Sequence, residues 1–422
     1  MVVAMGIGRF AFTPILPLMQ RDLGMSHVVA GWLASLNYLG YLAGAVACTA
    51  APRFFRSQVV GGCTLILSLA TTLAMGMTIS PFWWGILRLM SGAASAVLFI
   101  VISAEVGESL ARRGYGHWFG ALYGGVGFGI AVSGLIVPQL DKAGGWSMAW
   151  TGIGSLAVFC AVTGAVLGRT RDYSPTVVPV NMERTAGLRV ILPLAAAYFL
   201  EGLGYIVIAT FLVAIIAATP GLEPFAPYSW VAVGIAAMPS TVLWPYLARR
   251  VGNRRALLAA YGIQVAGILV SRHAVSVAQV LFAAVTFGGT FLGITAMTLA
   301  EGSLRMGKNG RQAAAFLTAG FSIGQMLGPV IAGKLAAHQD GFALPLLMAA
   351  ASVMCGCLFT IFDKHYSTGK PIGKELRHAV RQHQDNQGGS HPGAESPVDP
   401  GSNTIAGRCA GQEPGDDSRC HR

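Results

Sequence analysis

Charged side chains are scarce in this chain. Only 11% of its 422 residues are Asp, Glu, Lys or Arg, whereas 54% are hydrophobic. Soluble domains carry about 25% charged residues, so the composition argues against an ordinary soluble protein. The mean hydropathy is +0.58 although residues 363–422 are polar, so the remainder is more apolar still. The sequence therefore predicts a core that is surrounded by lipid.

Several motifs that would indicate other classes of protein are also missing. The seven cysteines show neither metal-ligand nor disulfide spacing, so no metal or other cofactor is predicted. The chain has no Walker sequence, which argues against ATP-driven transport, and no nucleophile, paired carboxylates or metal cluster that would indicate an enzyme. The N-terminus lacks the basic segment and the cleavage site of a signal peptide, so we interpret it as the first membrane span.

Apolar runs, each long enough to cross about 30 Å of hydrocarbon, recur along most of the chain. They predict an all-α membrane protein with twelve spans, at residues 1–20, 27–50, 58–79, 82–104, 117–140, 148–168, 190–216, 228–248, 255–271, 275–300, 312–336 and 343–362. A polar break divides the spans into six and six. The predicted domains are a six-helix bundle at 1–168, a cytoplasmic linker at 169–189, a second six-helix bundle at 190–362 and a disordered cytoplasmic tail at 363–422.

Basic residues are segregated between the two sets of loops that connect the spans. Fifteen lie in one set, whereas the opposite set contains only Arg21, Lys142, Arg272 and Lys334. Because basic loops remain in the cytoplasm, both termini are predicted to be cytoplasmic. The net charge of +11 is then a topology signal, and it does not indicate a nucleic-acid partner.

The two predicted bundles are related by an internal repeat. A shift of 196 residues aligns glycines and charged residues of the first half with those of the second. The aligned pairs are Gly6 with Gly202, Gly8 with Gly204, Arg53 with Arg249, Gly92 with Gly288 and Glu105 with Glu301. Since each half has an even number of spans, the repeats are predicted to be parallel, with a pseudo-symmetry axis along the membrane normal.

Short motifs carry a resemblance to a known transporter family. They are LRLMSGAASAVLFI, in which Arg88 precedes Gly92 by four residues, and the basic loops APRFFRSQ and ARRVGNRRAL. With the split into six and six spans, residues 1–362 resemble the major facilitator superfamily, and GIGRFAFTPILPLM together with YFLEGLGYIVIATFL is similar to its bacterial YbfB/YjiJ-type branch. The resemblance implies a major facilitator fold. It also implies a first helix that starts further upstream, which would place the natural start codon before Met1.

Three ionisable side chains fall inside the predicted spans, and these are Arg9, Arg88 and Glu201. A charge in the bilayer is costly, so all three should face protein or water. The repeat aligns Arg9 with Tyr205, one helical turn from Glu201. If the first and seventh helices line a central cavity, as the resemblance implies, Glu201 exchanges a proton while Arg9 binds an anionic substrate group or keeps Glu201 ionised. The alternative is a fixed ion pair that only locks the two halves together.

Other polar residues are weaker candidates. The resemblance implies that Arg88 serves proton coupling or substrate binding, although it could also snorkel or tie helix ends together. Candidates to line the cavity, with an interhelical hydrogen bond or interfacial anchor as the alternative, are Asn37, Tyr41, Tyr198, Tyr205 and Gln264. Glu105 with Arg53, and Glu301 with Arg249, are candidates for a cytoplasmic gate, with solvated helix ends as the alternative.

These observations predict a secondary transporter of the bacterial inner (plasma) membrane. It would move a small organic solute by alternating access, driven by the proton gradient. The predicted partners are that solute, protons and membrane lipid, with the protein acting as a monomer. The competing hypothesis is a membrane sensor or scaffold on a transporter-like fold that does not transport.

Overall fold

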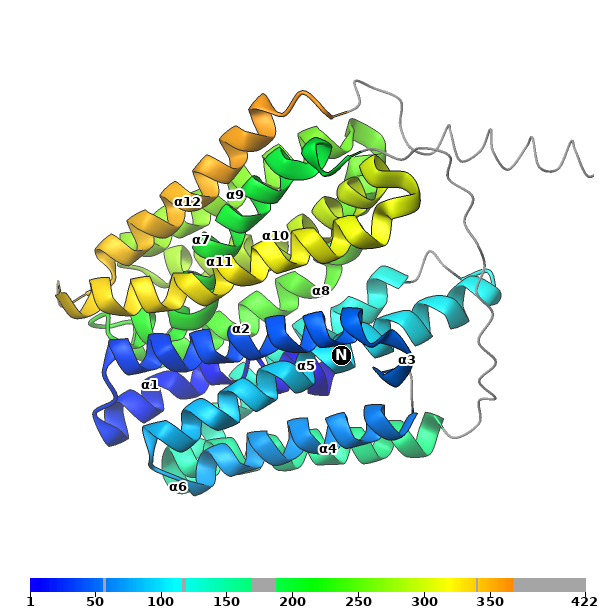
Figure 1. Ribbon diagram of the computed structural model, residues 1–422. Coiled ribbons are helices and arrows are strands. Elements are labelled where there is room, and N and C mark those ends of the chain that lie inside the picture. Colours follow the sequence, from blue (N-terminus) through cyan, green and yellow to red (C-terminus); the bar gives the residue numbers. More distant parts are fainter. Residues whose placement is uncertain (56–57, 116–118, 169–186, 339–340, 367–422) are drawn as a thin grey trace, which may run out of the picture. The chain divides into compact units, whose positions relative to one another are not determined.

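The computed structural model describes residues 1–55, 58–115, 119–168, 187–338 and 341–366, and every regular element among them is a helix (Figure 1). The α-helices are α1 (Phe12–Leu23), α2 (His27–Ala50), α3 (Pro52–Phe55), α4 (Gln58–Ala74), α5 (Pro81–Arg112), α6 (Phe119–Gly168), α7 (Leu192–Ala217), α8 (Ala226–Val251), α9 (Asn253–Arg272), α10 (Val277–Met306), α11 (Gly310–His338) and α12 (Ala343–Phe362). A π-helix, η1 (Val2–Ile7), precedes them, and 3₁₀ turns occur at Met75–Met77, Leu188–Ile191, Glu223–Phe225 and Gly307–Asn309.

Ten of the described helical segments are long and apolar enough to cross a membrane. The prediction of twelve spans differs from this number at two places. The described part of the predicted span at 117–140 and the whole span at 148–168 fall within α6, whose backbone leaves the helical region at Gly144 and Gly145. Gly145 has a φ of +67°, a conformation that favours glycine. The span predicted at 255–271 corresponds to α9, which is not among the ten.

The predicted linker and tail fall largely outside the described residues. Residues 169–186 of the linker and 367–422 of the tail are not described. The described part of the predicted tail, residues 363–366, contains two buried side chains, Asp363 and Tyr366. These residues are therefore packed against the helices, which differs from the prediction of a disordered segment that begins at residue 363.

Close helix packing recurs at positions that are 196 residues apart. A Cβ atom at Gly92 on α5 would collide with the carbonyl oxygen of Asn37 on α2, and one at Gly288 on α10 would collide with that of Val233 on α8. Gly288 lies 196 residues after Gly92, and Val233 lies 196 residues after Asn37. The same contact between helices is thus built twice, which supports the internal repeat.

Gly288→Ala is expected to destabilise the protein, whereas Gly289→Ala is expected to leave its stability unchanged or raised. The new methyl group at position 288 meets the backbone of α8, and such overpacking costs about 1–3 kcal/mol. At position 289 nothing lies within 4 Å of the added Cβ, and alanine is favoured over glycine in a helix by about 1 kcal/mol. Thermal unfolding of the two purified variants, which differ by one position on one helix, measures the contrast. Equal unfolding temperatures would contradict the packing described here.

Two further helix pairs join the segments before and after the predicted linker. Helix α2 packs against α11, where Gly31 lies against the carbonyl of Pro329 and Gly333 lies against that of His27 (Figure 1). Helix α8 packs against α6. Because glycines let backbones approach closely, the α2–α11 contact is tight at the end of the bundle where α2 begins.

Candidate functional site

Arg9 lies in an irregular turn between two helical pieces of the first span. The π-helix ends before it (Val2–Ile7), and α1 begins only at Phe12. Pro14 accounts for this start, because proline has no N–H to donate to the carbonyl four residues earlier. The predicted span at 1–20 thus changes from π-helical to α-helical geometry around its arginine, within one apolar span at Val2–Leu23. π-helical turns are frequent at functional sites.

The guanidinium of Arg9 is held by neutral groups. Arg9 is 4% exposed, and its Nη2 donates a hydrogen bond of 3.0 Å to Oε1 of Gln325 on α11. Its Cζ lies 4.6 Å and 4.4 Å from the ring centroids of Tyr38 and Tyr41 on α2. None of the ion pairs among the described residues includes Arg9, and its Nε has no hydrogen-bond partner. A buried cation therefore retains unused donor capacity.

Gln325 joins two equivalent positions of the repeat. It accepts from Arg9 and also donates through Nε2 to the hydroxyl of Tyr205 on α7. Arg9 and Tyr205 are 196 residues apart. One turn further on, Thr13 Oγ1 donates over 2.5 Å to the carbonyl of Ala209, which is again 196 residues away. A residue touches its own equivalent only near the axis that relates two copies, so these contacts mark where the repeats meet.

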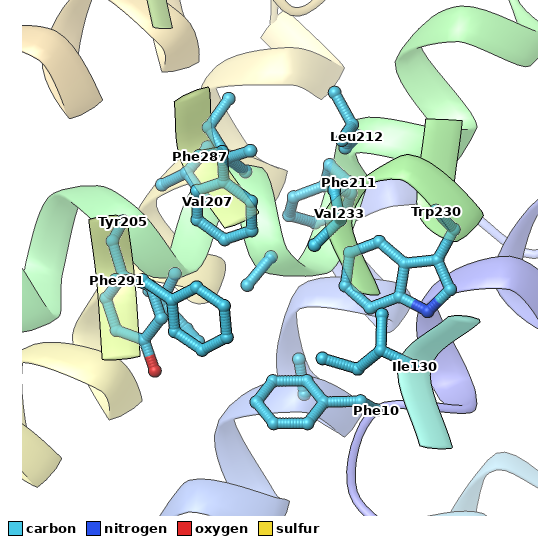
Figure 2. Packing of buried hydrophobic residues seen from close by; sticks show 14 of the residues in the cluster. Phe10, Ile130, Tyr205, Val207, Phe211, Leu212, Trp230, Val233, Phe287 and Phe291 are labelled. Carbon is cyan, nitrogen blue, oxygen red and sulfur yellow. The ribbon is translucent and has the colours of Figure 1, made fainter. Parts of the chain in front are cut away.

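Aromatic rings are stacked beside this bridge. The centroid of Tyr205 lies 5.3 Å from that of Phe321, which lies 4.1 Å from that of Tyr198. Phe291 is 6.0 Å from Tyr205 and 5.2 Å from Phe287, and Figure 2 shows these three rings grouped together. In each of these four pairs the angle between the two ring planes is 8–11°. Five side chains from α7, α10 and α11 thus form an array of nearly parallel rings.

Glu201 belongs to a separate polar chain. It is 1% exposed on α7, and its Oε1 accepts a hydrogen bond of 2.8 Å from Nε2 of Gln264 on α9. Gln264 in turn accepts a bond of 3.1 Å from the hydroxyl of Thr290 on α10. The second carboxyl oxygen of Glu201 has no hydrogen-bond partner. A carboxyl group is therefore buried with one neutral donor.

The structure does not bring Arg9 and Glu201 together as an ion pair. Arg9 bonds to an amide on α11, whereas Glu201 bonds to an amide on α9. The hypothesis of a fixed ion pair between them is therefore wrong for this structure. The two side chains bond to different helices, which their related positions in the repeat did not reveal.

Arg88 and Asn37 contribute to the contact between α5 and α2. Arg88 is 2% exposed, with its Nε 3.4 Å from the carbonyl of Leu33 and its Cζ 4.6 Å from the ring of Phe12. It is buried and does not snorkel. Asn37 donates over 2.9 Å to the backbone carbonyl of Arg88, which is the interhelical hydrogen bond named as its alternative role.

A second buried charge cluster, which we call the Arg305 network, lies at the end of α10. Glu301 accepts hydrogen bonds of 2.9 Å from both Arg305 and Asn253. Arg305 also bonds over 2.7 Å to Asp363, beyond α12, and its Cζ lies 4.3 Å from the ring of Tyr366. Burial raises the pKa of the Tyr366 phenol, so this ring remains neutral. The network ties α9 and α10 to the residues that follow α12.

The predicted gate pairs are not formed as expected. Glu301 pairs with an arginine on its own helix, and Arg249 instead lies 5.9 Å from the ring of a tyrosine on α8. Glu105 is exposed on α5 and takes part in none of the ion pairs among the described residues. The side chain of Arg53 lies outside the described residues.

The sequence reasoning missed Gln325 and the Arg305 network. Gln325 is the polar residue of GFSIGQMLGP, an otherwise apolar, glycine-spaced segment, and that isolated amide was the available signal. Arg305 was counted only as a loop charge, and Asp363 was assigned to the tail. No sequence spacing links these two residues, which are 58 positions apart.

Comparisons with known proteins give one family match and one solved structure of similar fold. The family described as "Uncharacterised MFS-type transporter YbfB" matches residues 1–360. A point mutant of the nucleoside transporter NupG, known from a crystal structure, superposes with a TM-score of 0.65. It covers 86% of this chain and 98% of its own, at 12% sequence identity, so it shows the fold alone. Among curated proteins, no sequence matches this chain.

Proposed function

The chain belongs to the YbfB-type family of major facilitator superfamily transporters, and from this membership we propose that it is a proton-coupled secondary transporter of a small organic solute. It is an integral, multi-pass membrane protein. In the proposal it acts as a monomer in a bacterial inner membrane, with both termini in the cytoplasm. The segregation of basic residues between loops supports this orientation.

The proposed topology has twelve crossings in two six-helix bundles. Helix α6 supplies two of them, because the break at Gly144 and Gly145 divides its 50 residues. Helix α9 supplies another, since its 20 residues are long enough to span and its arginines lie near its ends. The repeated glycine contacts support the division into two bundles of the same origin.

The observation that carries the proposal is the bridge from Arg9 through Gln325 to Tyr205. It joins equivalent positions of the two repeats and contains a buried cation that pairs with no carboxylate among the described residues. In transporters built from repeats, substrate sites lie at the repeat interface near the middle of the membrane. A charge kept inside a span marks a functional site by default. We therefore place the solute at this bridge.

Glu201 is the proposed proton carrier. It is the buried carboxyl nearest in sequence to the bridge, on the same helix as Tyr205. An ionised carboxylate is costly in an apolar interior unless it is paired, so movement of the halves that changes its surroundings would change its proton occupancy. Exchange of a proton at Glu201 would then be coupled to alternating access.

Alternating access requires the tight α2–α11 contact to open. At this contact the ring of His27 also packs against that of Phe342, at 4.9 Å. If both termini are cytoplasmic, the end of the bundle where α2 begins faces the outside. We therefore propose that this conformation is closed toward the outside. The Arg305 network is the proposed tether at the opposite, cytoplasmic end.

Flux in proteoliposomes tests this function. Vesicles that contain the purified chain and the pH-sensitive dye pyranine receive benzoate, glutamate, uridine, glucose or choline in separate experiments. Proton movement that depends on one solute and on the protein is the expected result. If none of these solutes moves protons or is itself accumulated, although at least one binds the folded protein, the sensor or scaffold hypothesis is favoured instead.

A further inference from the structure

Among the described residues of the first half, buried positive charge exceeds buried negative charge. Arg9 and Arg88 are both buried, and no ion pair among the described residues includes either one. Glu201, in the second half, is the buried carboxyl of this central region, and it bonds to an amide. A buried cation without a counterion is expensive, and an anion that binds and leaves would lower this cost. A cationic solute would meet repulsion from both arginines.

Arg9 is the arginine that can receive this anion. Its guanidinium is oriented by Gln325 on one side and by the faces of Tyr38 and Tyr41 on another, and its Nε retains an unused N–H. A planar guanidinium matches a carboxylate in shape and charge, and the unpaired N–H at Nε is the donor left for it. Arg88 is less suited, because its Nε already faces the carbonyl of Leu33.

The surroundings of Arg9 also indicate the shape of the solute. Gln325 connects the guanidinium directly to Tyr205, which belongs to the array of nearly parallel rings with Phe321 and Phe291. Phe10, next to Arg9 in sequence, approaches Phe291 from the first span, with 6.2 Å between ring centroids (Figure 2). Aromatic faces bind flat, unsaturated groups best, through offset stacking.

We propose that the Arg9 site binds a small planar aromatic carboxylate, with the carboxylate on the Arg9 guanidinium and the ring stacked in the array around Tyr205. This substrate class rests on the proposed transport function. The anion would supply the acceptor that Arg9 lacks. Its movement together with one proton would be electrically neutral for a monocarboxylate.

Equilibrium binding of radiolabelled benzoate to the purified full-length chain tests the class. Three unlabelled competitors separate the features of the site: cyclohexanecarboxylate keeps the charge without a flat ring, benzamide keeps the ring without the charge, and acetate keeps only the charge. Benzoate is expected to bind saturably. Cyclohexanecarboxylate should compete about three- to tenfold less well, which is the share of ring stacking. Benzamide should compete at least about 30-fold less well.

Variants test the carboxylate contact and the ring contact separately. Arg9→Gln and the charge-preserving Arg9→Lys are both expected to weaken benzoate binding by at least about 30-fold. Phe321→Leu should reduce the preference for benzoate over cyclohexanecarboxylate while leaving cyclohexanecarboxylate binding nearly unchanged. The control is Arg21→Gln on α1, because that arginine is exposed and pairs with Asp22 and Asp141. Size-exclusion profiles show which variants are folded.

The outcomes separate this class from the transport function. The class is overturned if folded wild-type protein shows no saturable benzoate binding, if benzamide competes as well as benzoate, or if folded Arg9→Lys binds benzoate normally. Proton-coupled flux of a different solute in proteoliposomes would then leave the transport function standing. Conversely, benzoate binding with the expected competitor order but without any flux supports the site while contradicting transport.

Discussion

Glu201→Gln is expected to abolish accumulation of the solute by a proton gradient while preserving solute exchange. Glutamine keeps the shape of the side chain and an oxygen that can accept from Gln264, but it cannot carry a proton. One pH unit corresponds to about 1.36 kcal/mol, so coupling to one proton lets the wild type accumulate solute up to about tenfold per unit. In the variant the inside-to-outside ratio should fall to 1.

Two assays on the same proteoliposomes measure this difference. Uptake against a pH gradient reports coupling, and exchange between labelled external and unlabelled internal solute reports movement of the loaded carrier without net proton transfer. The matched control is Glu223→Gln, which makes the same substitution at an exposed position outside the candidate site. Normal gradient-driven accumulation by Glu201→Gln would rule out Glu201 as the proton carrier. Loss of both activities in a folded variant would show a role in conformational change instead.

The helices were predictable because their signals are local. Uninterrupted apolar runs end at polar breaks, and the predicted spans at 27–50 and 343–362 coincide with α2 and α12. The two copies of the repeat were detectable for the same reason, since equal spacing survives in the chain whatever the packing. The predicted break between the spans at 117–140 and 148–168 follows the same rule, because it contains Gly144 and Gly145, where the backbone of α6 leaves the helical region.

The partners of the charged residues were not predictable in the same way. The alignment of Arg9 with Tyr205 placed both at equivalent positions, but the amide that bridges them comes from α11 and depends on how that helix is rotated. Equivalent faces of the first and seventh helices left an ion pair between Arg9 and Glu201 open as an alternative. Their actual neighbours are glutamines on two other helices, Gln325 and Gln264. Periodicity in the sequence predicts which face of a helix a residue occupies. Its side-chain partner depends in addition on how several helices are rotated and at what depth they lie relative to one another.

The end of the second bundle shows a different limit. Composition alone assigns Asp363 to a polar tail, since the residues after α12 are rich in charge, glycine and proline. In the structure Asp363 is buried and forms an ion pair with Arg305. Arg305 lies on α10, which ends at Met306, far earlier in the chain. A composition argument treats each charge as solvated, and it fails where two charges neutralise each other inside the protein.

Arg305→Met is expected to be among the most destabilising single substitutions outside the central site. The side chains of Arg305, Glu301 and Asp363 are almost fully buried, so removal of the cation leaves two buried carboxylates with too few partners. Breaking a buried ion pair by removing one partner costs about 3–5 kcal/mol. The thermal unfolding temperature of the purified variant should therefore fall by several degrees or more.

A triple variant separates the charge effect from the loss of packing. In Arg305→Met combined with Glu301→Gln and Asp363→Asn, no unpaired charge remains, and neutral groups of similar size replace the whole network. When well-packed uncharged side chains of similar size replace a whole buried ion network, the stability of the protein often changes little. Most of the lost stability should therefore return. If the triple variant were no more stable than Arg305→Met, the arginine would act mainly through its contacts with Tyr366 and the backbone of Val190. Recovery would instead show that charge compensation holds the residues after α12 against α10.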